Sequence, residues 1–75
     1  MTLEFYINDE YADTIGVYYD DHFAVPRIGE YIRLDSDDFS DHCPYKNKGL
    51  MEVLATKIVH NITDETVEIY TKYRK

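Results

Sequence analysis

Residues 35–43 hold the densest group of side chains that could bind a metal ion or act in catalysis. These nine positions read DSDDFSDHC and contain four aspartates, one histidine and the only cysteine of the chain. Carboxylate, imidazole and thiolate groups are common metal ligands, and a thiolate can also be a nucleophile. The segment therefore raises three alternatives: a metal site, an acidic surface for a basic partner, or a solvated loop.

The spacing of these residues fails the usual metal-site patterns. Three aspartates fit positions one, three and seven of a calcium-loop template, namely Asp35, Asp37 and Asp41. However, Ser40 replaces the glycine at position six and Lys46 replaces the bidentate glutamate at position twelve. A zinc site would have to use the three adjacent residues 41–43, and the paired spacing that marks such sites is missing. We expect no metal site and no other cofactor.

Catalytic patterns are also weak. Cys43 could be a nucleophile with His22, His42 or His60 as its base, but the surrounding sequence matches no nucleophile motif. His60 is better explained by a local hydrogen bond at the end of a strand. The three glycines are too far apart to form a phosphate-binding loop. We therefore expect that the protein is not an enzyme and has no catalytic residues.

Length and composition indicate one small domain over residues 1–75. Hydrophobic residues make up 44% of the chain and charged residues 31%, as in globular proteins. No apolar run approaches the roughly 20 residues that cross a bilayer, and the first residues do not resemble an export signal. A single cysteine excludes an internal disulfide. The expected location is the cytoplasm, without membrane contact.

The charge of the chain is unevenly distributed. Fifteen acidic and eight basic residues give a net charge of −7. Eleven of the acidic residues lie in residues 1–45, whereas residues 46–75 hold six of the basic ones. The field of the first part would oppose phosphate binding, so direct nucleic-acid binding is not expected.

Alternating apolar and polar residues predict five short strands. The predicted strands cover residues 2–8, 14–19, 30–34, 50–62 and 66–74. Both parities of 50–62 are apolar, which fits either a strand with a β-bulge near residues 55–57 or one short helix. The strand is favoured because β-branched residues dominate the segment, at Val53, Thr56, Ile58 and Val59. The predicted fold is all-β, a five-stranded antiparallel SH3-like barrel or strongly curled sheet. Residues 35–49 lack alternation and are expected to form one long acidic loop.

Two stretches add a resemblance that covers roughly residues 25–34 and 51–70. These are VPRIGEYIRL and EVLATKIVHNITDETVEIY, with Pro26, Gly29 and Glu30 forming a turn into a strand and His60 ending a valine-rich strand. The chain resembles small uncharacterised bacterial and phage proteins with an SH3-like β-barrel. The resemblance implies the fold but no activity, because that group has no function to transfer.

The function expected from these observations is that of a small acidic protein-protein interaction module. Outward-facing tyrosines are expected on four strands, at Tyr6, Tyr18, Tyr31 and Tyr70. The partner would be another protein, such as a basic nucleic-acid-binding protein, or a second copy of the chain. The candidate partner-binding residues are Asp20, Asp21, Asp35, Asp37, Asp38, Phe39, Asp41 and Tyr45.

Two alternatives remain open for the acidic residues. Their carboxylates could mimic the phosphates of a nucleic acid, which would make the protein a phage or mobile-element inhibitor of a nucleic-acid-binding protein or nuclease. They could equally belong to a partly mobile solvated loop, since aspartate is favoured in turns. Phe39 and Tyr45 suggest binding, or they pin the loop to the barrel.

Overall fold

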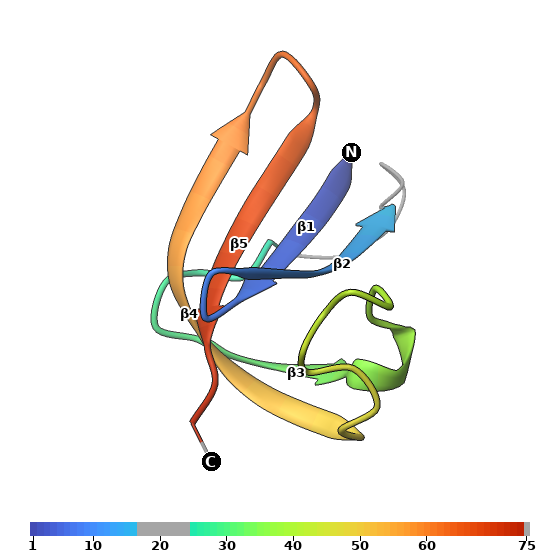
Figure 1. Ribbon diagram of the computed structural model, residues 1–75. Helices are drawn as coiled ribbons and strands as arrows, with labels where there is room; N and C mark the ends of the chain where they lie inside the picture. The colour runs from blue at the N-terminus through green and yellow to red at the C-terminus, as the bar shows by residue number, and fades with distance from the viewer. Residues whose placement is uncertain (17–24, 75) are drawn as a thin grey trace.

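The computed structural model describes residues 1–16 and 25–74, which form an all-β fold. A 3-10 helix, η1, follows the third of five strands. The bounds are β1 Thr2–Ile7, β2 Glu10–Gly16, β3 Tyr31–Asp35, η1 Ser36–Asp38, β4 Leu50–Asn61 and β5 Thr66–Lys72. The sheet is strongly curled, and β4 bends along its whole length (Figure 1). The prediction of an all-β, five-stranded curled sheet is therefore confirmed.

The sheet is mixed, which corrects the prediction of a purely antiparallel arrangement. Its strand order is β2-β1-β5-β4-β3. Three of the pairs are antiparallel, but β1 and β5 are parallel, with Thr2 beside Thr66 and Ile7 beside Thr71. The alternation of apolar residues determines which face of a strand is buried, but it contains no information on strand direction. The parallel pair therefore could not follow from the pattern.

The first hairpin turns two residues after β1. Asn8 and Asp9 both have positive φ angles, 48° and 69°, as in a two-residue hairpin turn of type I′. β2 consequently begins at Glu10, so the prediction that this strand starts at residue 14 was wrong. Turn-forming residues continue through Asp13, so the sequence predicted a longer turn than the two residues observed. The remainder of that predicted strand lies outside the described residues.

The second half of the chain follows its pattern closely. The register of β4 against β5 shifts between Ala55 and Lys57, which confirms the predicted bulge. The hydroxyl of Thr56, in the bulge, donates a hydrogen bond of 3.3 Å to the carbonyl oxygen of Tyr70. In β3, Leu34 is buried whereas Tyr31 is exposed, as the alternation predicts.

The core lies on the concave face of the sheet. Its buried side chains include those at alternate positions of β1 and β5, and Phe39 and Cys43 extend it from the segment after η1. The buried hydrophobic residues are Leu3, Phe5, Ile7, Ala12, Leu34, Phe39, Cys43, Met51, Val53, Ala55, Val67 and Ile69. Within residues 1–16 and 25–74, no helix has both the length and the apolar character needed to span a bilayer.

Candidate functional site

Residues 36–49, the acidic segment, are anchored by the buried side chain of Ser36. Its hydroxyl donates a hydrogen bond of 2.7 Å to the carbonyl oxygen of Gly49 and accepts one of 2.6 Å from the backbone N–H of Lys48. The backbone N–H of Ser36 also donates to the Gly49 carbonyl, at 3.0 Å. The two ends of the segment are thereby joined at the exit of β3. A segment held in this way presents its side chains at fixed positions.

Further contacts hold the middle of the acidic segment. Phe39 and Cys43 are 3% and 5% exposed and pack in the core. The ammonium group of Lys46 donates hydrogen bonds to the carbonyl oxygens of Phe39, at 2.8 Å, and of Asp37, at 3.3 Å. It also lies 3.3 Å from a carboxylate oxygen of Asp41. Because the Cys43 thiol is buried, it is poorly placed to react with a solute.

The aspartates that were predicted to bind a partner differ in their surroundings. Asp35, Asp37, Asp38 and Asp41 are exposed, but Asp35 accepts a hydrogen bond of 3.0 Å from the backbone N–H of Asp37 and so caps η1. Asp41 pairs with a lysine, as described above. Asp37 and Asp38 therefore present the least engaged carboxylates of this group. Asp20 and Asp21 lie outside the described residues.

The two aromatic candidates of the segment hold it in place. Phe39 is buried, so it corresponds to the alternative in which this ring pins the segment to the sheet. Tyr45 is half-buried, accepts a hydrogen bond of 2.8 Å from the side-chain amide of Asn8 and packs edge-on against Tyr73 at 6.0 Å. No group of three His, Cys, Asp or Glu side chains in the described part of the chain could hold a metal ion.

Three tyrosines and a lysine form a ladder across the outer face of the sheet. The rings of Tyr6 and Tyr70 are stacked with centroids 4.8 Å apart, and Tyr11 meets Tyr6 edge-on at 5.7 Å. The ammonium group of Lys57 lies 5.2 Å from the centre of the Tyr70 ring. These residues are neighbours in the registers of β2, β1, β5 and β4. We call this group the tyrosine ladder.

Acidic neighbours and partial burial raise the pKa values of two phenols in the tyrosine ladder. The Tyr70 hydroxyl donates a hydrogen bond of 2.6 Å to a carboxylate oxygen of Glu68, which raises the pKa of Tyr70 to about 12. Partial burial, with the charges of Glu4 and Glu68, raises the pKa of Tyr6. Each ring of the ladder is already paired with a neighbour inside the chain. The tyrosine ladder therefore serves mainly to stabilise the sheet.

The outer face of β3 and β4 carries a groove that the sequence analysis did not identify. Tyr31 and Leu50 are 69% and 78% exposed, and Leu54 lies between Tyr31 and Lys72 in the strand registers. The groove has a volume of about 570 Å³. Its lining residues are Tyr31, Leu50, Glu52, Leu54, Lys72, Tyr73 and Arg74. The outward position of Tyr31 was predicted. The outward leucines were not, because apolar residues occupy both alternating sets of positions in 50–62 and the pattern does not tell inward from outward there.

The walls of this groove are fixed by their surroundings. Arg33 and Glu52 form an ion pair of 3.3 Å between β3 and β4. Beyond β5, the side-chain oxygen of Asn8 accepts a hydrogen bond of 3.2 Å from the backbone N–H of Tyr73, and its amide donates one of 3.4 Å to the Tyr73 carbonyl. Asn8 thus holds residues 72–74 against the sheet. We call the cavity between them and β4 the β4 groove.

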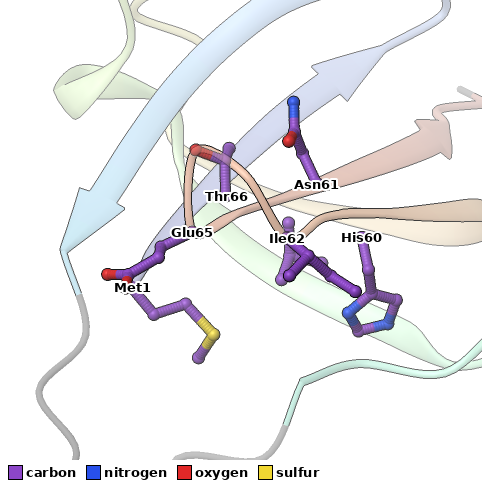
Figure 2. Close-up of a pocket in the computed structure, with 7 residues that line it drawn as sticks. Met1, His60, Asn61, Ile62, Glu65 and Thr66 are labelled. Atoms are coloured by element: carbon purple, nitrogen blue, oxygen red, sulfur yellow. The ribbon is translucent and has the colours of Figure 1, made fainter.

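A smaller pocket lies near the turn between β4 and β5. Figure 2 shows Met1, Ile62 and His60 among the residues that line it. Its volume is about 280 Å³, and Ile62 is 88% exposed. The turn is closed by hydrogen bonds between Asn61 and Asp64, which orient those side chains toward each other. The side chain of Asn61, one of the polar residues that line the pocket, is therefore already engaged within the turn.

Comparison with protein-family models, curated proteins and solved structures gave no match. The fold and surface together define the class of molecule: a small all-β domain with a curled five-stranded mixed sheet and an exposed groove on its outer face. Its function has to be inferred from the chemistry of that surface.

Proposed function

We propose that this chain is a non-catalytic protein-protein interaction module and that the β4 groove receives the partner. The observation that carries the proposal is the exposure of two large apolar side chains in one groove, 69% for Tyr31 and 78% for Leu50. Exposed apolar side chains gathered in a concave patch are typical of protein interaction sites. Tyrosine suits such a site because its ring is large and its hydroxyl tolerates partial contact with water.

The position of these side chains favours binding energetically. Burying a leucine side chain removes apolar area from water and contributes roughly 1.5–3 kcal/mol. Tyr31 and Leu50 lie on paired strands, so their backbone is already ordered and little conformational entropy is lost on docking. Lys72 and Arg74, which both line the groove, add positive charge to a chain whose net charge is −7. They would orient a partner by its charges.

The proposal is tested by replacing one exposed leucine. Leu50→Ser removes apolar area from the groove, and Ile62→Ser makes a similar change at an 88% exposed position outside it. The tagged chain and both variants are used to isolate bound protein from cells that express them. We expect the unaltered chain and Ile62→Ser to retain the same partner, and a second copy of the chain counts as a partner. Leu50→Ser should retain at least about tenfold less of it.

Retention of the partner by Leu50→Ser at an unchanged level would show that the groove is not the binding surface. Circular dichroism and thermal melting of both variants exclude loss of folding as the cause. Because Leu50 is 78% exposed, its replacement is expected to change the free energy of unfolding by less than about 0.5 kcal/mol.

A second candidate function, phosphate mimicry, is favoured by the anchoring of the acidic segment. Asp37 and Asp38 project exposed carboxylates from η1, which the Ser36 hydrogen bonds hold against Lys48 and Gly49, just before β4. Fixed negative charges of this kind suit a basic nucleic-acid groove, as an inhibitor from a phage or mobile element would require. The matching experiment measures binding to a basic nucleic-acid-binding protein at several salt concentrations.

Phosphate mimicry predicts binding that weakens steeply with salt and with Asp37→Asn plus Asp38→Asn. A matched control, Glu10→Gln plus Glu65→Gln, removes the same two charges from exposed positions elsewhere. Binding that is independent of salt would reject mimicry, because contacts between exposed charges are screened by salt. Equal weakening by the control would show that net charge alone explains the effect, and would reject mimicry as well.

Two finer inferences complete the proposal. We infer that the curl of the sheet is SH3-like, on the basis of five short strands and the bulge at Ala55 and Lys57. An experimental structure with a different strand order would reject it. We also place the protein in the cytoplasm, because its single cysteine needs no oxidising compartment. Cell fractionation tests this location.

A further inference from the structure

We propose that the occupant of the β4 groove is a second copy of this chain, in a two-fold symmetric dimer. In this dimer, the acidic carboxylates beside Leu50 in each copy contact the basic end of the groove in the other. This inference rests on the proposed function, because it names the partner for the same groove. It is carried by the order of charges across the groove and by their complementarity.

The strand registers place acidic, apolar and basic side chains in sequence across this face. Asp35 is the neighbour of Leu50 at one end, where η1 continues the acidic edge. At the other end, Leu54 is the neighbour of Lys72, and Arg74 lines the same wall of the groove as Lys72. The two outward leucines of β4 therefore differ in their neighbours: Leu50 lies beside negative charge, Leu54 lies beside positive charge, and the Arg33–Glu52 ion pair lies between them.

A face of this kind is complementary to itself. A two-fold axis near the Arg33–Glu52 pair brings the acidic end of one copy onto the basic end of the other, and does so twice. Tyr31 and Leu50, which are otherwise exposed, would then be buried against the same face of the second copy. Between the two ends, Arg33 and Glu52 lie 3.3 Å apart and offset each other's charge near the axis.

Neither an acidic nor a basic protein would complement the face as well as a second copy does. An acidic protein would meet Lys72 and Arg74 but would be repelled by Asp37 and Asp38, and a basic protein would have the opposite problem. Since each copy carries a net charge of −7, two copies repel each other except where opposite charges are aligned. Association therefore depends on the aligned ends, and reversing them should abolish it.

Two charge-reversed variants and their mixture test the proposal. Asp37→Lys plus Asp38→Lys makes both ends of the face basic, and Lys72→Glu plus Arg74→Glu makes both ends acidic. Sedimentation velocity is measured for the unaltered chain and each variant, up to about 1 mM. We expect the unaltered chain to dimerise and the dissociation constant of each variant alone to rise at least about tenfold.

The equimolar mixture gives the decisive result. A heterodimer of the two variants has opposite charges at both contacts, so mixing should restore dimers that neither variant forms alone. Glu10→Lys plus Glu65→Lys reverses two exposed acidic residues elsewhere and should leave dimerisation in place. Mixing also separates this pairing from a general effect of net charge, because the mean charge of the mixture is that of the unaltered chain.

Three outcomes would overturn the proposal: a monomer at every concentration, dimers that survive both reversals, or a mixture that stays monomeric. They leave the proposed function separately testable. If the chain is monomeric but another protein binds in a Leu50-dependent manner, the second copy is excluded and the interaction module stands. If neither the chain itself nor another protein binds through Leu50, both are rejected.

Discussion

The rings of Tyr6 and Tyr70 stack with centroids 4.8 Å apart and planes inclined by 15°. They are direct neighbours in the parallel pair of β1 and β5, which joins the two ends of the chain. Tyr6 and Tyr70 thus pack over the junction of the first and last strands on the outer face of the sheet. Phe5 and Ile69 pack at the same junction in the core.

We expect Tyr6 and Tyr70 to be energetically coupled. Replacing either ring by leucine keeps apolar area but removes the stack, so a double-mutant cycle of Tyr6→Leu and Tyr70→Leu should give a coupling of about 1 kcal/mol. Urea unfolding measures the four free energies. Tyr6→Leu combined with Tyr31→Leu is the control cycle and should give a coupling near zero, because Tyr31 lies on the edge strand β3. A Tyr6–Tyr70 coupling no larger than the control would contradict a stabilising ladder.

The Tyr70 phenol should make stability depend on pH in the alkaline range. Its hydrogen bond to Glu68 raises its pKa to about 12 in the folded chain, whereas an unfolded tyrosine titrates near 10. A raised pKa means that the folded state holds the proton more tightly. The contribution is therefore fully present below pH 10 and is lost as the pH rises toward about 12.

Two measurements check this prediction. The chemical shift of the ring carbon that bears the Tyr70 hydroxyl should titrate near 12 in the unaltered chain and closer to 10 in Glu68→Ala. The free energy of unfolding should fall less between pH 10 and 12 in Tyr70→Phe than in the unaltered chain. An unchanged titration in Glu68→Ala would show that the carboxylate is not the cause.

The buried hydroxyl of Ser36 is expected to stabilise the acidic segment. Ser36→Ala leaves the N–H of Lys48 without its acceptor and the Gly49 carbonyl with one donor fewer. The cost should be about 1–3 kcal/mol of unfolding free energy, measured by urea titration. Ser40→Ala is the control: within the described residues this half-exposed hydroxyl accepts a single long hydrogen bond of 3.4 Å, so we expect less than about 0.5 kcal/mol. Equal effects of the two replacements would contradict the anchoring role.

The sequence was sufficient to predict the parts of the fold that depend on local alternation. Leu3, Phe5 and Ile7 alternate with polar residues and are buried, and Val67 and Ile69 do the same in β5. The bulge could be predicted because two-residue periodicity breaks once within 50–62. Such features depend only on which side of a strand each residue occupies.

Features that depend on pairing between distant segments could not be predicted. The parallel contact of β1 and β5 pairs the first strand with the last, and the alternation within each strand is compatible with either direction. The β4 groove requires that β3, β4 and residues 72–74 lie together. In the acidic segment, no local pattern marks Ser36 as an anchor, because its hydrogen-bond partners lie about a dozen positions later.

The side chain of Asn8 should control one wall of the β4 groove. Its φ angle of 48° is in the left-handed region, which glycine adopts without strain, so Asn8→Gly removes the side-chain hydrogen bonds to Tyr45 and Tyr73 while retaining the turn. We expect the amide of Tyr73 to lose protection from hydrogen exchange and the free energy of unfolding to fall by about 1 kcal/mol. Partner binding in the groove should weaken too, because residues 72–74 would lose their fixed position.

Asn47→Gly is the matched control for this change. Asn47 also has a positive φ angle, 62°, but in the acidic segment, far in sequence from the groove residues 72–74. Replacing it with glycine should leave the protection of the Tyr73 amide unchanged, because this amide is bonded to Asn8. Asn8→Ala should cost about 1–2 kcal/mol more than Asn8→Gly, since alanine is strained in the left-handed region. If Asn8→Gly left the Tyr73 amide fully protected, residues 72–74 would be held by other contacts, and the turn would have no part in shaping the groove.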